Sequence, residues 1–300
     1  MEAAMEKKNM EIQAINHQTI GQRLKSYKRS PLSLVLLLLV SVSALLTVLT
    51  LLFLIAYILI KGIPYLTPSL FAWEYTTENV SLMPALINTI LMTALSLVIA
   101  VPLGIFAAIY LVEYARRGNK IVEIVRITAE TLTGIPSIVY GLFGFLLFGV
   151  ALKWGYSMLG GALTLAIMIL PTIIGVVEPA LRAVPRSYYE GALALGATHE
   201  RSVYTAVVPA ASSGILAGVV LGVGRAMGET MAVIMVAGNQ PRMPKGILQG
   251  VRTLTGNIVI EMGYAAGLHR EALIATGVVL FVFILLMNLC FSVLKRGKKA

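Results

Sequence analysis

The sequence has no aspartate, and it has one cysteine and three histidines in 300 residues. Without aspartate the chain cannot carry out intramembrane aspartyl proteolysis, and all 14 acidic residues are glutamate. A single cysteine, Cys290, cannot form an intramolecular disulfide, and its apolar run predicts a buried, inert thiol. Because His17, His199 and His269 all lie outside the long apolar runs, metal and serine–histidine chemistry have little support. We therefore expect no catalytic residues and no metal site.

Charge is also scarce, since 13% of the residues are charged whereas 58% are hydrophobic, with a mean hydropathy of +0.85. Apolar runs recur along the whole chain, which is typical of a polytopic membrane protein. The net charge of +10 is explained by basic cytoplasmic loops, so no nucleic-acid partner is expected.

Six apolar runs have the length that crosses a bilayer, the longer ones with tilt. They predict an all-α fold of six transmembrane helices at 32–60, 84–112, 124–150, 159–183, 210–238 and 272–294. The segments on one side of these spans hold 17 of the Lys and Arg residues, and those on the other side hold 6. The excess places both termini in the cytoplasm.

The polar segments complete the predicted organisation. A basic cytoplasmic leader, 1–31, precedes the first transmembrane helix at 32–60, and a basic cytoplasmic tail occupies 295–300. The external loop 239–271 carries apolar runs beside prolines and basic residues. It could re-enter the membrane surface or pack on another protein, and the sequence does not decide between the two.

The fifth span carries two charges, Arg225 and Glu229, at a spacing that predicts one shared helix face. They could simply neutralise each other, or they could line a transport path, which is where intramembrane charges are often found. A guanidinium fork matches oxyanions, and Ser137 and Thr230 could add hydroxyl donors, so an anionic solute is favoured. Glu130 either lies near the cytoplasmic interface or reaches Arg225.

Proline and glycine mark two further features of the spans. Pro136, in the third span, predicts either a simple kink or a functional break that lines a cavity. In the fifth span Gly214, Gly218 and Gly222 recur at every fourth position, and Gly224 and Gly228 have the same spacing. Such a ridge allows close helix packing and predicts a central helix.

The loop after the fourth span reads EGALALGATHERSVYTAVVP over 190–209 and predicts two short helices joined near Gly196. It resembles the cytoplasmic signature loop of binding-protein-dependent ABC importer permeases. The matching positions are Glu190, Ala192, Gly196 and Pro209. Gly191 departs from that pattern, in which alanine is usual.

Residues 84–238 more narrowly resemble the phosphate importer permeases of the Pst family. The motifs are AVPLGIFAAIYLVEYA at 100–115, GIPSIVYGLFG at 134–144, the loop above, and GRAMGETMAV at 224–233. This family has two related permeases, PstA and PstC. Residues 108–116 and 134–144 favour the PstA type, whereas 228–239 is also compatible with the PstC type.

This resemblance implies a type I ABC importer permease fold over 84–294, with a coupling loop at 184–209, in a bacterial plasma membrane. It places Arg225 and Glu229 on the phosphate path, to which Ser137 and Thr230 are added as candidates. The residues implied to couple the permease to its ATPase are Glu190, Gly191, Ala192, Gly196 and Ala197.

The same resemblance implies a set of partners. These are an ATP-binding subunit dimer, a sister permease in a homo- or heterodimer, an extracytoplasmic phosphate-binding protein, and inorganic phosphate as solute. No lysine completes a Gly-x-x-x-x-Gly-Lys-Ser/Thr loop, so ATP must bind to the partner and this chain needs no cofactor of its own. We expect a non-catalytic component of the transporter.

An ion-coupled secondary transporter of an anion is the alternative function. Arg225, Glu229 and an interrupted third span would suit proton-coupled anion movement. The signature loop favours the ABC permease, because a secondary transporter has no use for a docking helix.

Overall fold

The structure is a computed structural model that describes residues 31–116 and 118–297. All regular structure in these residues is helical, which confirms the all-α prediction. The predicted leader, apart from Pro31, and residues 298–300 of the predicted tail lie outside the described residues. Contacts divide the chain into two units between Tyr57 and Ile58.

The first described helix is α3, Pro31–Gly62. Its sequence holds no charged residue before Lys61, and its most apolar window has a mean hydropathy of 2.8. At a rise of about 1.5 Å per residue its 32 residues are longer than the ~30 Å hydrocarbon core, so it spans a bilayer with tilt. The predicted first transmembrane helix at 32–60 lies within it.

Four helices are long and apolar enough to cross a membrane, and two further pairs are bent, which gives up to six spans if each bent pair is one span. The long ones are α3, α4 (Met83–Ile109, continued by η3, Tyr110–Tyr114), α7 (Met158–Arg182) and α14 (Leu268–Gly297). The helices of the bent pairs are α5 (Lys120–Thr133), α6 (Ser137–Gly144), η4 (Phe145–Ala151), α9 (His199–Ser202), η5 (Val203–Val207), α10 (Val208–Ala210) and α11 (Ser212–Gly228).

The third predicted span, 124–150, folds as two helices and not as one kinked helix. Its two parts meet at an angle of 105° across Gly134, Ile135 and Pro136. The Tyr140 hydroxyl of α6 donates to the carbonyl of Leu132 in α5 at 2.7 Å, which fixes the two sides of the break.

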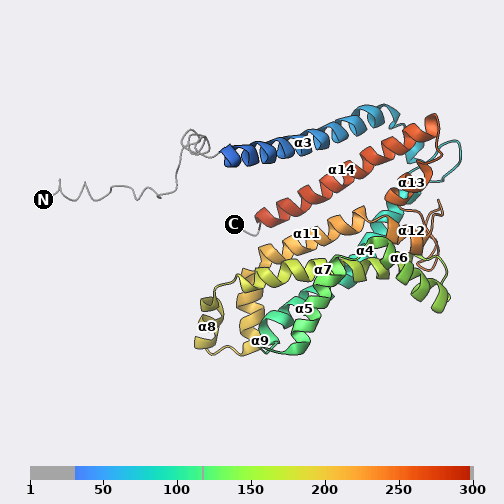
Figure 1. The fold of residues 1–300 in the computed structure, drawn as a ribbon. Coiled ribbons are helices and arrows are strands. Elements are labelled where there is room, and N and C mark those ends of the chain that lie inside the picture. Colours follow the sequence, from blue (N-terminus) through green and yellow to red (C-terminus); the bar gives the residue numbers. More distant parts are fainter. Residues whose placement is uncertain (1–30, 117, 298–300) are drawn as a thin grey trace. The chain divides into compact units, whose positions relative to one another are not determined.

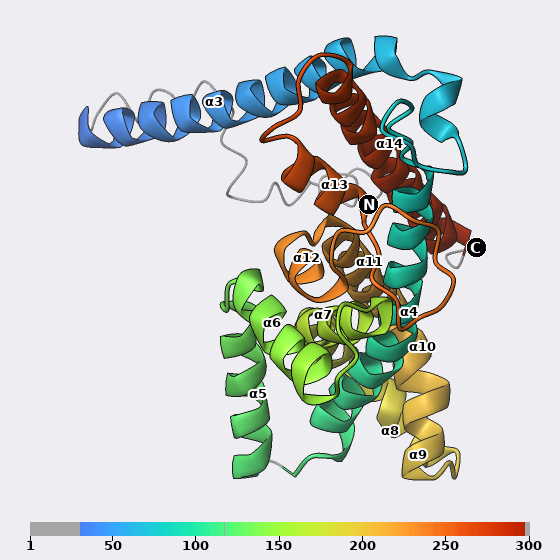
Figure 2. The same ribbon diagram turned by 90° about the vertical axis from the view of Figure 1, so that its right-hand side faces the viewer.

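The second unit is built around α4, α7 and α11, which lie side by side (Figures 1 and 2). Gly214, Gly218 and Gly222 of α11 face Ala180, Val177 and Ile173 of α7, so that the two backbones approach closely, as the glycine spacing predicts. Gly224 and Gly228 do not extend this ridge, because a Cβ on either would meet no atom within 4 Å.

Replacing Gly214 with alanine should destabilise this packing, because the new methyl group would overlap the Ala180 side chain. We expect a loss of about 1–3 kcal/mol, measured as a lower unfolding midpoint of the purified protein. Gly224→Ala is the matched control on the same helix and should be neutral or slightly stabilising. Equal effects of the two substitutions would contradict the assigned α7–α11 contact.

The external loop 239–271 packs on its own helix bundle. The Asn88 amide nitrogen of α4 donates to the carbonyls of Arg242 and Arg252, at 3.0 and 3.2 Å. The first amides of α7, on Met158 and Leu159, donate to loop carbonyls at 2.9 and 2.8 Å, which satisfies donors that a helix start leaves free.

A buried ion pair holds α13 (Leu254–Glu261) within this loop. Arg252, which is 6% exposed, donates to Asn257 Oδ1 at 2.9 Å and to Glu261 Oε1 at 2.7 Å. Its guanidinium also lies over the Tyr75 ring, 5.4 Å from the centroid. Desolvation and the neighbouring Glu261 raise the pKa of the Tyr264 phenol. The external loop is thus an ordered part of the bundle.

Cys290 is exposed on α14 and not buried as the sequence predicts. The same helix exposes Leu285, Leu286 and Leu289. An apolar run in a membrane protein can be satisfied by lipid as well as by a core, and hydropathy alone does not separate the two environments.

Candidate functional site

The fifth predicted span breaks within the GRAMGET motif. Helix α11 ends at Gly228, Glu229 has extended backbone (φ −70°, ψ 133°), and α12 runs over Met231–Ala237. Arg225 and Glu229 therefore do not share a continuous helix face, and that prediction was wrong. No ion pair within 4.0 Å joins Arg225 to a carboxylate among residues 31–116 and 118–297.

Arg225 is held by a hydroxyl group. Its Nη1 donates to Thr172 Oγ1 of α7 at 3.2 Å, and the side chain is partly buried. A guanidinium has five N–H donors, so this contact leaves most of them, and the full charge, available to an anion.

Glu229 and Thr230 form the break itself. Glu229 Oε1 accepts from the Ala232 amide at 3.2 Å at the start of α12, and the Glu229 carbonyl accepts from Thr255 Oγ1 at 3.0 Å. Thr230 Oγ1 donates to the Gly228 carbonyl at 3.2 Å. These hydrogen bonds connect the break to α13 and stabilise the start of α12.

The other polar candidates lie on the third span. Ser137 is the first residue of α6 and is partly buried, whereas Glu130 is exposed on α5 and makes no ion pair with Arg225. Helix α6 packs directly on α12, because a Cβ on Gly141 would lie 2.9 Å from Ala232 Cα. The helices that follow the two breaks therefore pack on each other.

Sequence reasoning missed Thr172. It is a lone polar group in an apolar run and directly follows Pro171 inside α7. The fold, and not any spacing in the sequence, brings it to Arg225.

The predicted coupling loop consists of α8 (Arg186–Ala194) followed by α9, so the prediction of two short helices joined near Gly196 is confirmed. Gly196 has φ +84°, and its amide donates to the Leu193 carbonyl at 2.9 Å. The Ala197 amide donates to the Ala192 carbonyl at 3.1 Å. This pair of bonds is a Schellman motif, which explains glycine at this position.

The coupling loop presents an apolar side chain to solvent. Leu195 is 91% exposed at the turn, and the neighbouring Glu190 and Gly191 are also exposed. Ala192 and Ala197 are partly buried. Leu195 was not among the candidates chosen from the sequence.

Aromatic contacts attach this loop to the bundle. The Tyr189 hydroxyl of α8 and His199 Nδ1 of α9 are hydrogen-bonded at 2.8 Å, and the Tyr114 ring of η3 meets the His199 ring edge-on at 4.9 Å between centroids. Val203 and Val207 of η5 belong to the core formed by α4, α7 and α11. The end of the loop is therefore packed into the same core as α4 and α7.

Comparisons with known proteins agree with this arrangement. Residues 100–299 match the family described as "Binding-protein-dependent transport system inner membrane component". The chain is 35% identical over 237 residues to the probable ABC transporter permease protein YqgH of Bacillus subtilis, covering 76% of each chain. It is 32% identical over 252 residues to the phosphate transport system permease protein PstC of Mesorhizobium japonicum, covering 75% of this chain and 76% of that one.

A solved structure shares the fold. It is a bacterial ABC transporter involved in the import of the acidic polysaccharide alginate, with a TM-score of 0.64 at 15% identity, covering 92% of this chain and 98% of that chain.

Proposed function

Because this chain belongs to the family of binding-protein-dependent transport system inner membrane components, we propose that it is the permease of an ATP-driven importer of inorganic phosphate. Relatives at 31–35% identity are named phosphate transport system permease protein PstC. Those names favour the PstC type. Two of the sequence motifs had instead favoured the PstA type. The chain would be a multi-pass protein of the bacterial plasma membrane, with both termini in the cytoplasm.

The observation that carries the phosphate assignment is that Arg225 has no carboxylate partner among the described residues. It is partly buried between α7 and α11 without a carboxylate partner and is held by Thr172 alone among the contacts of the described residues. A charge at membrane depth costs on the order of 3 kcal/mol. A tetrahedral oxyanion would supply the missing negative charge and accept from two arms of the fork at once.

The remaining site residues keep the break in place. Glu229 caps α12 and accepts no bond from Arg225, so phosphate does not displace an existing ion pair. Thr230 and Ser137 lie at the two breaks and are candidates for further hydroxyl donors along the path. Arg225 thus has the main role, and the other three residues shape its surroundings.

Coupling would run through α8 and the Gly196 turn. The residues Glu190, Gly191, Ala192, Gly196 and Ala197, with Leu195 at the tip, would seat in the ATP-binding subunit dimer. ATP would bind to that partner and would move α8 when the dimer closes. Because η5 shares a core with α4 and α7, the same movement would reach Thr172 and hence Arg225.

The other partners follow from this role. A sister permease, or a second copy, would complete the path along α11, and an extracytoplasmic binding protein would deliver phosphate to the external face. The external loop 239–271, which is ordered by Asn88 and Arg252, would form part of that face.

Phosphate uptake by the reconstituted complex tests the proposal. Proteoliposomes that contain the permease, the ATPase and the binding protein should accumulate phosphate with ATP and not with a non-hydrolysable analogue. A pH gradient without ATP should give background uptake. Uptake driven equally well by the gradient alone would favour an ion-coupled secondary transporter instead.

A further inference from the structure

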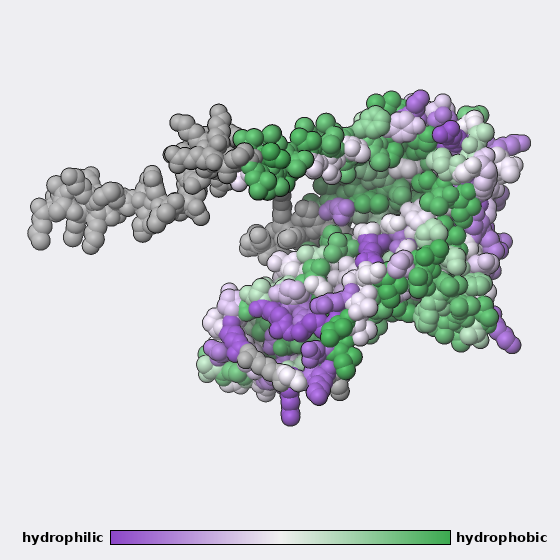
Figure 3. Space-filling view, in the orientation of Figure 1, coloured by the Kyte–Doolittle hydropathy of each residue, from purple (hydrophilic) through white to green (hydrophobic). Residues whose placement is uncertain are grey.

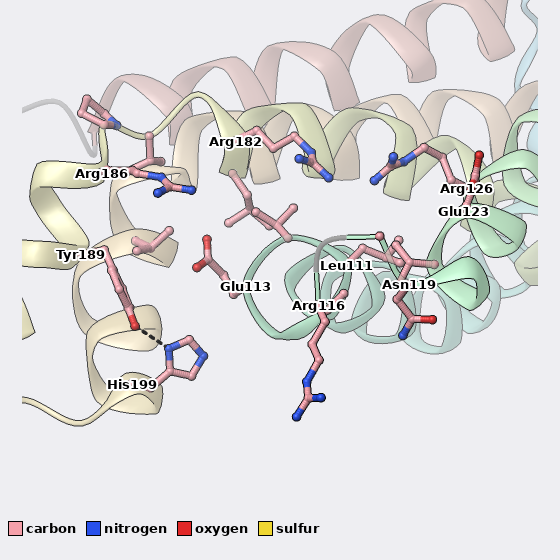
Figure 4. A pocket seen from close by; sticks show the side chains of 18 of the residues that line it. Leu111, Glu113, Arg116, Asn119, Glu123, Arg126, Arg182, Arg186, Tyr189 and His199 are labelled. Atoms are coloured by element: carbon pink, nitrogen blue, oxygen red, sulfur yellow. Dashed lines mark hydrogen bonds between the residues drawn. The ribbon is translucent and has the colours of Figure 1, made fainter.

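A pocket of about 730 Å³ opens at the end of the bundle that carries the coupling loop (Figure 4). Its walls come from the end of η3, the start of α5, the end of α7 and the start of α8. Figure 3 shows hydrophilic side chains gathered at this end of the molecule. The pocket is separate from Arg225, which does not line it.

Two arginines share one carboxylate oxygen beside the pocket. Arg126 Nη2 of α5 donates to Glu178 Oε1 at 2.7 Å, and Arg182 donates to the same oxygen from Nε at 3.1 Å and Nη2 at 2.9 Å. Glu178 is 8% exposed, whereas both arginines line the pocket. One carboxylate thus faces two guanidinium groups, whose other N–H donors remain available.

A third guanidinium completes this wall. Arg186, the first residue of α8, lies on the same side of the pocket as Arg126 and Arg182, whereas Arg116 points away (Figure 4). Arg186 makes no ion pair among the described residues.

Carboxylates are present in the pocket but do not neutralise this wall by contact. Glu113, Glu123 and Glu190 line the pocket, and none of them lies within 4.0 Å of a basic side-chain nitrogen in the described parts of the chain.

We propose that this pocket binds a phosphate group through Arg126, Arg182 and Arg186. A guanidinium group can donate two hydrogen bonds to two oxygens of one phosphate. The pocket volume also leaves room for a group attached to the phosphate. The location of this pocket on the cytoplasmic side of the membrane rests on the proposed function, which places the coupling loop in the cytoplasm. The phosphate group then comes from free inorganic phosphate or from an anionic lipid headgroup.

Binding to the full-length chain tests this site in an Arg225→Gln background, which removes the proposed transport site. Radiolabelled inorganic phosphate is titrated onto the protein in nanodiscs of phosphatidylcholine, whose headgroup has no net charge. Saturable binding should weaken at least tenfold in Arg186→Gln. Arg201→Gln is the matched control, because Arg201 is exposed on the neighbouring α9 and does not line the pocket; it should leave binding unchanged.

A second arm identifies the source of the phosphate group. Nanodiscs that contain phosphatidylglycerol are prepared with the same variants, and retained lipid is counted by native mass spectrometry. Phosphatidylglycerol retained by the parent and lost in Arg186→Gln assigns the pocket to a lipid headgroup. Saturable inorganic phosphate binding in phosphatidylcholine that weakens in Arg186→Gln assigns it to the free anion, and binding of either that is equal in Arg186→Gln overturns the site.

One pair of results overturns the proposal. It fails if inorganic phosphate does not bind in phosphatidylcholine and phosphatidylglycerol retention is the same in all variants. The Arg186 side chain makes no hydrogen bond to the described residues and takes no part in the Glu178 cluster, so Arg186→Gln should leave that cluster intact. The proposed function fails separately, if the reconstituted parent complex does not accumulate phosphate with ATP.

Discussion

Replacing Arg225 with glutamine should abolish phosphate uptake, with a loss of at least about 30-fold, while the complex still assembles. Glutamine can keep a hydrogen bond to Thr172, but it lacks the charge and the two-armed fork. A hydrogen bond to a charged group is worth about 1.5–3 kcal/mol, and 1.4 kcal/mol corresponds to a tenfold change. The measurement is ATP-driven uptake into proteoliposomes, with co-purification of the subunits as the assembly control.

Arg225→Lys separates charge from geometry. Lysine retains the positive charge but presents a point charge instead of a fork, so intermediate uptake is expected. Parent-like uptake in Arg225→Gln would remove Arg225 from the path.

Replacing Gly196 with glutamate should uncouple the permease from its ATPase. Gly196 has φ +84° in the Schellman turn, where a side chain costs about 1–2 kcal/mol. The new carboxylate would also stand beside Leu195, the exposed tip of the loop. We expect loss of co-purification, or loss of permease-stimulated ATP hydrolysis, together with loss of uptake.

Two variants control for this effect. Gly191 lies inside α8, has no positive φ, and a Cβ there meets no atom within 4 Å. Alanine is the usual residue at this position of the signature loop, so Gly191→Ala should leave the contact with the ATPase intact and favour the helix by up to about 1 kcal/mol. Gly196→Ala adds the strain without the charge and should fall between the two. Unchanged co-purification and unchanged stimulated hydrolysis in Gly196→Glu would refute the docking role.

The sequence was sufficient for features that depend on local chemistry. Apolar length predicts the membrane-spanning helices, and the glycine spacing predicts the close contact of α11 with α7. Gly196 is recognisable because the turn after α8 needs a left-handed residue. The 105° break at Pro136 could be located, although its size could not be predicted.

The break after Gly228 could not be predicted, because it depends on contacts from elsewhere in the chain. The spacing of Arg225 and Glu229 suits a helix. The structure instead uses the Glu229 side chain to cap α12, and Thr255 of α13, 26 residues further on, binds the Glu229 carbonyl. Tertiary hydrogen bonds thus stabilise a break where the local sequence pattern favours a continuous helix.

Contacts between residues far apart in the sequence explain why the partner of Arg225 and the partner of Arg126 were not predicted. Thr172 is 53 residues from Arg225 in the chain, and Glu178 is 52 residues from Arg126. Neither pair leaves a spacing signal, since each depends on which helix faces which.

The exposure of residue 225 to water in the working transporter tests the central claim most directly. In a Cys290→Ser background, Arg225→Cys should react with the water-soluble reagent 2-aminoethyl methanethiosulfonate while the complex turns over ATP. The ammonium group that this reaction installs should restore part of the lost phosphate uptake. A cysteine at 225 that never reacts, in any state of the ATP cycle, would show a side chain facing lipid or a sealed core and would contradict the account.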